Sequence, residues 1–349
     1  EVIQGFDETD SGAKKDAVWT PYSDRRVRVG IAGEGFCDFG SKFGYQNCPN
    51  AEVVACAELD AGKRAKLQER VKARKAYASC EEMIKHAAED RLEAVYIATD
   101  ARSHIQLAIM ALEHGLNVAS AVPAFLGKDQ LEFVPKLLDA ERASGKLYMM
   151  NETTAFRPEC FAMRRLYEAG LLGKISYTEG EYFHPHDPVK ESKLPHDYFS
   201  YKSWRWGLPP QYYPTHSNGF YSCTTHNMFT EVSCSGIPSL RFAYPPEADN
   251  EYGNIYGSEY AMLRCSDGST AGMLVAWDIP CWSGETGRIY GQKGCYVPEK
   301  GGYRSWFEEK ASALDLRKPP LPPGMDAGGH GGSHGYLTDD FLRAIILKD

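Results

Sequence analysis

The sequence predicts an α/β protein in which a doubly wound parallel sheet precedes an α/β domain with a large, open, mostly antiparallel sheet. Between Val27 and about Met150, strand-like and helix-like segments alternate with short loops, a pattern typical of parallel sheets with helices on both faces. After Met150, one helix-like segment is followed mainly by strand-like runs. We therefore expect an N-terminal arm, a first domain and a second domain at residues 1–25, 26–150 and 151–349.

The first strand and the turn after it carry the clearest local signal. Alternating apolar residues at 27–31 are followed by Gly33 and Gly35, directly before a helix-like segment. Such glycines let the backbone approach a pyrophosphate at a helix N-terminus, as in the G-x-G-x-x-G fingerprint of Rossmann domains. The match is incomplete, because Asp38 stands where the third glycine belongs and Gly40 follows two residues later.

A second strand, around 53–56, is followed by acidic residues. Glu58 lies roughly 20 residues beyond the glycines, where a carboxylate takes the ribose hydroxyls of NAD. Asp60 is a rival for this role, and a solvated strand end is the plain alternative. An acid at the ribose position disfavours the extra phosphate of NADP, so NAD is the expected cofactor.

The remaining elements follow from apolar runs and their periodicity. In the first domain we expect further strands at 94–99, 117–121 and 147–150, and helices at 61–75, 80–88, 104–114 and 128–144. In the second domain we expect strands at 175–183, 240–244, 260–265, 271–276 and 288–290, a helix at 160–169, and a final helix at 336–347 that packs on the Rossmann domain.

Composition narrows the class of protein. Hydrophobic residues make up 43% and charged residues 25%, with a net charge of −8 and no basic stripe, so nucleic acid is not an expected partner. No apolar run approaches the ~20 residues that span a bilayer. The ten cysteines are scattered and no disulfide is required. A start at Glu1 rather than Met and an end just after a helix are consistent with a removed leader and a missing C-terminal segment, so the compartment stays open.

Several landmarks together resemble the Gfo/Idh/MocA oxidoreductase superfamily. They are the glycine turn, the run 96–99 with His104 after it, the strand before Pro123, and the segment 169–175. The resemblance implies a Rossmann domain and a second domain whose open sheet forms a sugar pocket and the interface of a homo-oligomer, a dimer or tetramer. With Gly33, Gly35 and Glu58, the cofactor site is expected to include Phe36, Thr99, His104, Pro123 and Glu152.

The loop after the strand expected at 117–121 argues against an ordinary dehydrogenase of this superfamily. The usual members carry Glu-Lys-Pro there, and the lysine assists proton transfer, whereas this chain has Ala121-Val122-Pro123. A Val-Pro-Ala sequence at this place resembles glycoside hydrolase family 109, whose known type is an NAD-dependent α-N-acetylgalactosaminidase. That family has an acid where this chain has Ala121, and the segment from His184 to Tyr213 is shorter than the family's.

The resemblance to family 109 extends to polar residues in the order in which they occur. Those matching its catalytic positions are Glu152, Tyr182, His184, Tyr213 and His216. Expected to contact the sugar are Trp204, Arg205, Tyr213 and His186. The aromatic cluster around Trp204 stacks on a sugar face in this interpretation, and packs as core in the plain one.

The family's chemistry assigns roles to these residues. A tightly bound, recycled NAD oxidises C3 of a terminal sugar, the glycosidic bond is eliminated across C1–C2, water adds, and the ketone is reduced again. His216 takes the C3 hydroxyl proton, because imidazole titrates near neutral pH. Tyr182, tuned by Glu152, removes the C2 proton, although the assignment among Tyr182, Glu152 and His184 is open. Tyr213 donates to the leaving oxygen or fixes the sugar.

Alternatives accompany this interpretation. The spacing of His184, His186 and Asp187 suits metal ligands, but no further ligand pair is evident and no metal is expected. His330 and His334 close over the pocket or lie on the surface. The alternative functions are an NAD(P)-dependent sugar dehydrogenase and a non-catalytic sugar- or nucleotide-binding protein.

Overall fold

The computed structural model describes residues 13–348, except for residues 36, 186–202, 240–249 and 307–313. These residues form two compact domains. The first consists of residues 15–152 and 319–348, and the second of residues 153–318 with residues 13 and 14. The C-terminal segment after Lys318 thus lies with the first domain, and the boundary between the two follows Glu152.

The first domain contains a six-stranded parallel sheet in the order β3-β2-β1-β4-β5-β6. Its strands are β1 (Val27–Ala32), β2 (Ala51–Ala57), β3 (Lys75–Tyr77), β4 (Ala94–Ile97), β5 (Asn117–Ser120) and β6 (Tyr148–Met150). The order reverses between β1 and β4, which makes this the doubly wound topology expected from the alternating sequence pattern. The predicted fold class is confirmed here.

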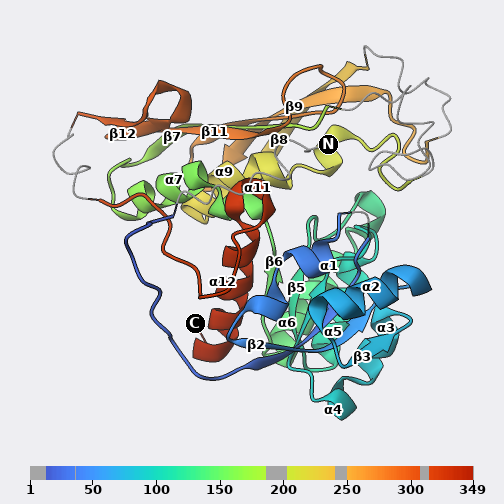
Figure 1. The fold of residues 1–349 in the computed structure, drawn as a ribbon. Coiled ribbons are helices and arrows are strands. Elements are labelled where there is room, and N and C mark those ends of the chain that lie inside the picture. The colour runs from blue at the N-terminus through green and yellow to red at the C-terminus, as the bar shows by residue number, and fades with distance from the viewer. Residues whose placement is uncertain (1–12, 36, 186–202, 240–249, 307–313, 349) are drawn as a thin grey trace. The chain divides into compact units, whose positions relative to one another are not determined.

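This domain also contains helices (Figure 1). They are α1 (Phe39–Lys42), α2 (Ala61–Val71), α3 (Cys80–Lys85), α4 (Ala87–Asp90), α5 (His104–Glu113), α6 (Phe133–Ser144), α11 (Gly329–Gly332) and α12 (His334–Leu347). Of these, α2, α3 and α5 contact strands of the sheet. Apolar side chains of α3, α5 and α6 share one core with β2, β4 and β5. Helix α12 contacts β1, and the Thr338 hydroxyl donates to the Phe43 carbonyl.

Some helix boundaries in the first domain differ from the prediction. The helix expected at 128–144 begins at Phe133, and the segment expected as one helix at 80–88 forms α3 and α4. The helix expected at 61–75 ends at Val71, and a short strand, β3, follows it. Lys72 adopts a left-handed conformation with φ of 55°, which stops the helix. A lysine gives no sequence signal for that conformation, since glycine is the usual residue there.

The second domain contains a seven-stranded sheet in the order β13-β12-β11-β7-β10-β9-β8. Its strands are β7 (Ile175–Phe183), β8 (Phe229–Pro238), β9 (Tyr256–Cys265), β10 (Thr270–Ala276), β11 (Gly284–Gly291), β12 (Gly294–Val297) and β13 (Gly302–Ser305). Only the central β7–β10 pair is parallel among these neighbours. The predicted large, mostly antiparallel sheet is therefore confirmed.

Helices α7 (Pro158–Glu168) and α9 (Thr215–Thr225) lie on one face of this sheet, which we call the inner face (Figure 1). Among the described residues no helix covers the opposite, outer face. Tyr260 and Met262 of β9 and Ile237 of β8 are partly exposed there. The predicted homo-oligomer would use this face, and it stays a prediction.

Among the described residues, one α-helix and three strands of the second domain were not expected: α9, β8, β12 and β13. Helix α9 is rich in threonine, serine and glycine, which are weak helix formers, so its sequence gives little helical signal. Strand β8 carries polar residues on both faces. The strand expected at 240–244 lies outside the described residues.

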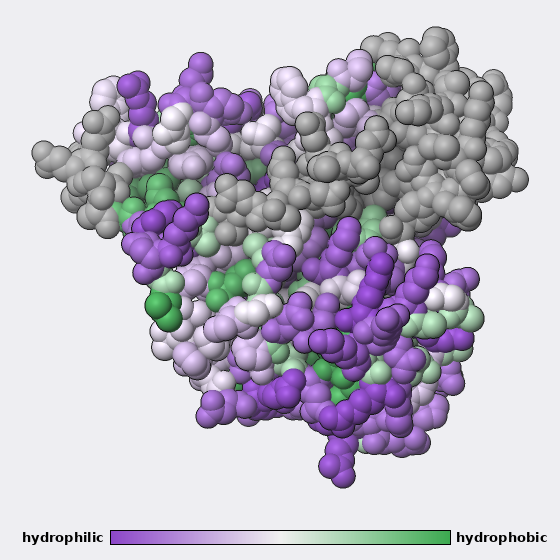
Figure 2. Space-filling view, viewed as in Figure 1, coloured by the Kyte–Doolittle hydropathy of each residue, from purple (hydrophilic) through white to green (hydrophobic). Residues whose placement is uncertain are grey.

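The visible surface of the first domain is mostly hydrophilic, with small apolar patches (Figure 2). In the part of the chain that the structure describes, no helix combines the length and the apolar character that crossing a membrane requires.

Candidate functional site

The glycine turn after β1 has the geometry of a dinucleotide loop. Gly33 and Gly35 both have positive φ values, of 88° and 54°. A Cβ at Gly33 would lie 2.5 Å from the Ala98 carbonyl oxygen, so no larger residue fits there. Among the described residues, a Cβ at Gly35 would have only that same oxygen within 4.0 Å. The backbone at Gly35 is therefore open to a ligand. Phe36 lies outside the described residues.

Gly40 performs the packing role of the missing third glycine. It lies in the first turn of α1, where a Cβ would come within 2.2 Å of the Gly33 carbonyl oxygen. Asp38, at the expected glycine position, instead precedes α1 in a left-handed conformation with φ of 55°. The loop is therefore two residues longer than the G-x-G-x-x-G fingerprint before helix and strand meet.

Glu34, between the two glycines, is a buried residue that the sequence analysis missed. Its carboxylate accepts hydrogen bonds from the Ser41 amide (3.0 Å) and hydroxyl (2.8 Å), and pairs with Arg70 Nη1 at 2.7 Å. Arg70 also pairs with Asp38 at 3.1 Å, and both acids raise the pKa of the arginine. These contacts attach the loop to α1 and α2.

The two acids at the end of β2 have different environments. The Glu58 carboxylate accepts from the backbone amides of Glu34 (2.9 Å) and Gly35 (3.4 Å), so it faces the glycine loop. Asp60 is the N-cap of α2 and accepts from the Lys63 amide at 2.8 Å, a hydrogen bond that lowers its pKa. Because Asp60 is engaged in capping, Glu58 is the better candidate for the ribose hydroxyls.

His104 connects three of the predicted cofactor residues. Its Nδ1 lies 2.8 Å from the Pro123 carbonyl oxygen and its Nε2 lies 3.1 Å from that of Thr99. The imidazole is 2% exposed, at the start of α5. It thereby holds together the loops that follow β4 and β5, at the carboxyl ends of the strands, where ligands of doubly wound sheets bind.

These features fit NAD. The open backbone at Gly35 would receive the pyrophosphate, and Glu58 would take the ribose hydroxyls. Thr99, His104 and Pro123 lie at the strand ends beyond the loop. Glu152, after β6, is buried in the same domain, and its role toward cofactor or substrate stays a prediction.

In the second domain, glycines bring α9 unusually close to the inner face of the sheet. A Cβ at Gly180 of β7 would lie 2.1 Å from the Ser217 carbonyl oxygen, and one at Gly287 of β11 would lie 2.2 Å from the Phe220 ring. On α9 itself, a Cβ at Gly219 would lie 2.8 Å from Thr154. The first turn of α9 is thus pressed against β7 and β11.

This close approach gathers the predicted catalytic residues of the second domain. The Tyr182 ring lies 4.7 Å from the His216 ring, which in turn lies 5.5 Å from Tyr213. His184, just after β7, has its ring 6.0 Å from Tyr182. All four side chains are buried. Trp277 packs perpendicular to Tyr182, at 5.6 Å.

The predicted sugar-contacting residues adjoin this cluster. The Arg205 guanidinium lies 4.2 Å from the Trp204 ring and 4.7 Å from the Tyr213 ring, which is cation–π geometry. The rings of Trp204 and Tyr213 are 6.4 Å apart. His186 and Asp187, and with them the metal alternative, lie outside the described residues.

A buried ion pair under His216 was missed by sequence reasoning. Glu285 of β11 lies directly opposite Tyr182 in the strand register, and its carboxylate accepts from Arg157 Nε at 2.6 Å and Nη2 at 3.0 Å. The Thr154 hydroxyl donates to the same carboxylate at 2.7 Å. No sequence signal marks Glu285, because the strand expected at 288–290 begins three residues after it, whereas β11 spans Gly284–Gly291.

His330 and His334 belong to the first domain and are buried, not on the surface. Their rings are joined by a 2.8 Å contact between Nδ1 of His330 and Nε2 of His334. His334 stacks on Phe43, at 4.3 Å between ring centroids, so the pair packs beside the helix that follows the glycine loop.

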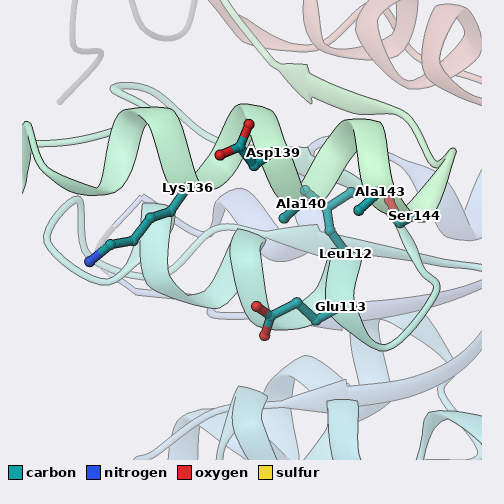
Figure 3. Close-up of a pocket in the computed structure, with 7 residues that line it drawn as sticks. All are labelled: Leu112, Glu113, Lys136, Asp139, Ala140, Ala143 and Ser144. Carbon is teal, nitrogen blue, oxygen red and sulfur yellow. The ribbon is translucent and has the colours of Figure 1, made fainter.

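A separate groove lies between α5 and α6 (Figure 3). It is lined by Leu112, Glu113, Lys136, Asp139, Ala140, Ala143 and Ser144. None of the predicted site residues is among them. We assign no role to it.

Comparison with known families identifies the class of the first domain. Residues 27–152 match the model of the oxidoreductase family with an NAD-binding Rossmann fold. They are an NAD-binding Rossmann domain, and the predicted resemblance to the Gfo/Idh/MocA superfamily and the NAD cofactor are confirmed.

Individual relatives extend the resemblance to one family of glycosidases. A glycosyl hydrolase family 109 protein of Porphyromonas gingivalis is 31% identical over 166 residues, which cover 45% of this chain and 34% of that protein. An α-N-acetylgalactosaminidase of Bacteroides fragilis is 32% identical over 95 residues, which cover 27% of this chain and 22% of the enzyme. The predicted resemblance to family 109 is confirmed, although the matches span about a third of the length of such relatives, or less.

Solved structures share the fold of both domains. Levoglucosan dehydrogenase in complex with NADH and levoglucosan superimposes with a TM-score of 0.68 at 18% identity, covering 92% of this chain and 90% of that one. Scyllo-inositol dehydrogenase from Lactobacillus casei, with bound NAD(H) and scyllo-inositol, gives 0.66 at 15% identity, with 93% and 90% covered. At such identities the likeness establishes the fold.

Proposed function

We propose that the protein is an NAD-dependent, redox-neutral glycosidase that acts on a terminal sugar. The observation that carries the proposal is the buried cluster of Tyr182, Tyr213 and His216, three groups able to move protons on one face of one domain. The resemblance to family 109 proteins supports it. Val122, where superfamily dehydrogenases have a proton-transferring lysine, supports it as well.

His216 is the proposed base for the C3 hydroxyl of the sugar. Its imidazole is buried against aromatic rings, and imidazole accepts a proton near neutral pH. Bound NAD would supply the hydride acceptor for oxidation at C3 and the hydride donor for the final reduction, and would therefore be recycled. The resulting ketone acidifies the C2 proton, and this makes elimination of the C1 substituent accessible without two opposed carboxylates.

Tyr182 is the proposed base for the C2 proton, and Tyr213 the donor to the departing glycosidic oxygen. The two rings are 6.3 Å apart, which lets them act on neighbouring carbons of one sugar ring. As the C2–H bond breaks, the C1–O bond breaks and a C1–C2 double bond forms. Water then adds its hydroxyl to C1 and a proton returns to C2. Arg205, Trp204 and Tyr213 hold the sugar in this proposal.

The competing enzymatic function is a sugar dehydrogenase that exchanges hydride with free NAD. The solved dehydrogenases of the same fold keep this alternative open. A non-catalytic binding protein is the third possibility, suggested by Ala121 in place of the acid of family 109.

A panel of α- and β-aryl glycosides, each incubated with and without added NAD, separates these functions. The proposal predicts release of the aryl alcohol without net NADH formation. Accumulating NADH with an intact glycoside would make the protein a dehydrogenase. If NAD is bound but is not reduced, and no glycoside in the panel is cleaved, the result would favour a non-catalytic binding protein. The next variant to make would then be Ala121→Glu.

A further inference from the structure

Glu285 is a buried carboxylate that meets side chains from other elements of the second domain. It lies on β11, while Arg157 precedes α7 and His216 belongs to α9. Its side chain is 1% exposed, and those of Arg157 and His216 are 6% and 4% exposed. A charged group so enclosed is tolerated only when its partners are in place, so the position of each neighbour is informative.

Arg157 and Thr154 fix the orientation of this carboxylate. The guanidinium binds both oxygens, through Nε to Oε2 and Nη2 to Oε1, and the Thr154 hydroxyl also donates to Oε2. Bidentate, charge-assisted hydrogen bonds of this kind leave little rotational freedom. Oε2 therefore receives two donors, and Oε1 receives Arg157 and faces His216.

The imidazole of His216 presents Nδ1 to this assembly. Nδ1 lies 3.6 Å from Oε1 of Glu285 and 3.4 Å from the Thr153 hydroxyl oxygen. An ionised carboxylate accepts hydrogen bonds and cannot donate them. A hydrogen on Nδ1 is favoured by this neighbour, whereas a lone pair on Nδ1 is repelled by it.

We infer that Glu285, held by Arg157, is a positioning residue that keeps His216 in its Nδ1–H tautomer, so that Nε2 is the atom that accepts the substrate proton. The catalytic consequence rests on the proposed function, while the tautomer itself does not. When Nε2 takes a proton, the imidazolium faces a negative charge, which is the arrangement that serves histidine bases in other enzymes.

Glu285 is not the only charged or titratable group beside His216. In the described part of this domain, the titratable or charged groups near it include Glu285, Arg157, Tyr182 and Tyr213. Arg157 and Glu285 form an ion pair whose formal charges sum to zero, so in this inference the carboxylate orients the ring without requiring it to be protonated. A general base must be unprotonated when the reaction begins, and pairing of Glu285 with Arg157 is compatible with a neutral imidazole.

The test uses the full chain labelled with 15N-histidine. Long-range 1H–15N spectra distinguish a protonated ring nitrogen from one with a lone pair, and the His216 signals among the ten histidines are found by comparison with His216→Gln. The inference predicts Nδ1–H in the wild type and a shift toward Nε2–H in Glu285→Gln, because the new amide can donate to Nδ1. A wild-type His216 in the Nε2–H form would overturn it.

Kinetics on a glycoside substrate give the second readout. Glu285→Gln should lower kcat by about 10²- to 10⁴-fold with little change in KM, and should move the acid limb of the pH profile to lower pH. Glu179→Gln, which removes a partner of Arg288 on the outer face of the same strands, is the matched control and should leave both unchanged. A kcat for Glu285→Gln equal to that of this control would contradict the inference.

Two further outcomes are decisive. If Glu285→Gln does not fold, Glu285→Asp keeps the charge but withdraws it, and should give a mixture of tautomers and an intermediate kcat. If the chain lacks glycosidase activity but His216 shows Nδ1–H in the wild type and not in the variant, the inference stands and the proposed function fails.

Discussion

The two faces of the seven-stranded sheet carry the same kind of ion pair in different surroundings. On the inner face, Arg157 and Glu285 have side chains that are 6% and 1% exposed. On the outer face, Arg288 and Glu179 lie opposite each other on β11 and β7 and are 23% and 35% exposed. The strands are shared, so the difference comes from what covers each face.

The comparison shows why the inner pair is suited to orienting a neighbouring side chain and the outer pair is not. Solvent screens Arg288 and Glu179, and Arg288 also contacts Glu181 and Glu299, so no single geometry is imposed. Under α9, water is displaced and Glu285 has a fixed set of donors. Fixed charge in a low-dielectric site is what orients a catalytic group.

The largest expected effect comes from breaking the inner pair. Arg157→Met leaves the Glu285 carboxylate buried without its guanidinium, and should lower the free energy of unfolding by about 3–5 kcal/mol. Arg288→Met on the outer face should cost at most about 1 kcal/mol. Urea unfolding followed by circular dichroism measures both. Equal losses for the two variants would mean that the faces do not differ in the way described.

A smaller effect is expected from glycines on the two faces. Gly180→Ala places a Cβ against the backbone oxygen of Ser217 on α9, which cannot move without shifting the helix, and should cost about 1–3 kcal/mol.

Gly272→Ala is the matched control for this substitution. Its Cβ would meet the hydroxyl end of the Tyr260 side chain, which can swing away on the outer face, so the midpoint of thermal unfolding should change less than for Gly180→Ala. The reverse order would contradict the close packing of α9 on β7.

The smallest effect on stability is expected from substitutions of exposed apolar residues on the outer face. The same substitutions should have the largest effect on assembly. We expect the chain to form a dimer or tetramer through this face, where Tyr260 and Met262 are 43% and 56% exposed. The double variant Tyr260→Glu, Met262→Glu should be monomeric by light scattering, with an unchanged circular dichroism spectrum. A monomeric wild-type protein would remove the prediction.

The first domain could be predicted almost element by element because its signals are local. The first strand, the glycine turn, the helix after it and the acid after β2 lie within about thirty residues of one another. The periodicity of apolar residues then identifies helices one after another. Among the exceptions, Lys72 and Asp38 are residues in left-handed conformations, for which glycine would have been the usual sequence signal.

The second domain could be predicted only in part, because its site depends on contacts between distant segments. Tyr182 and His216 were found through the resemblance to a family, and the structure brings them together. Glu285 can be recognised as a site residue only from the register of β7 and β11, which places it beside Tyr182. No pattern within β11 distinguishes this glutamate from an exposed one.

The measurement that tests the central claim most directly is the deuterium content at C2 of the sugar released in D2O. If oxidation at C3 and removal of the C2 proton precede loss of the glycosidic substituent, NMR will show deuterium at C2 and no net NADH. Tyr182→Phe should abolish release while bound NAD is retained. Sugar released with hydrogen fully retained at C2, at a rate unaffected by Tyr182→Phe, would contradict the proposed reaction.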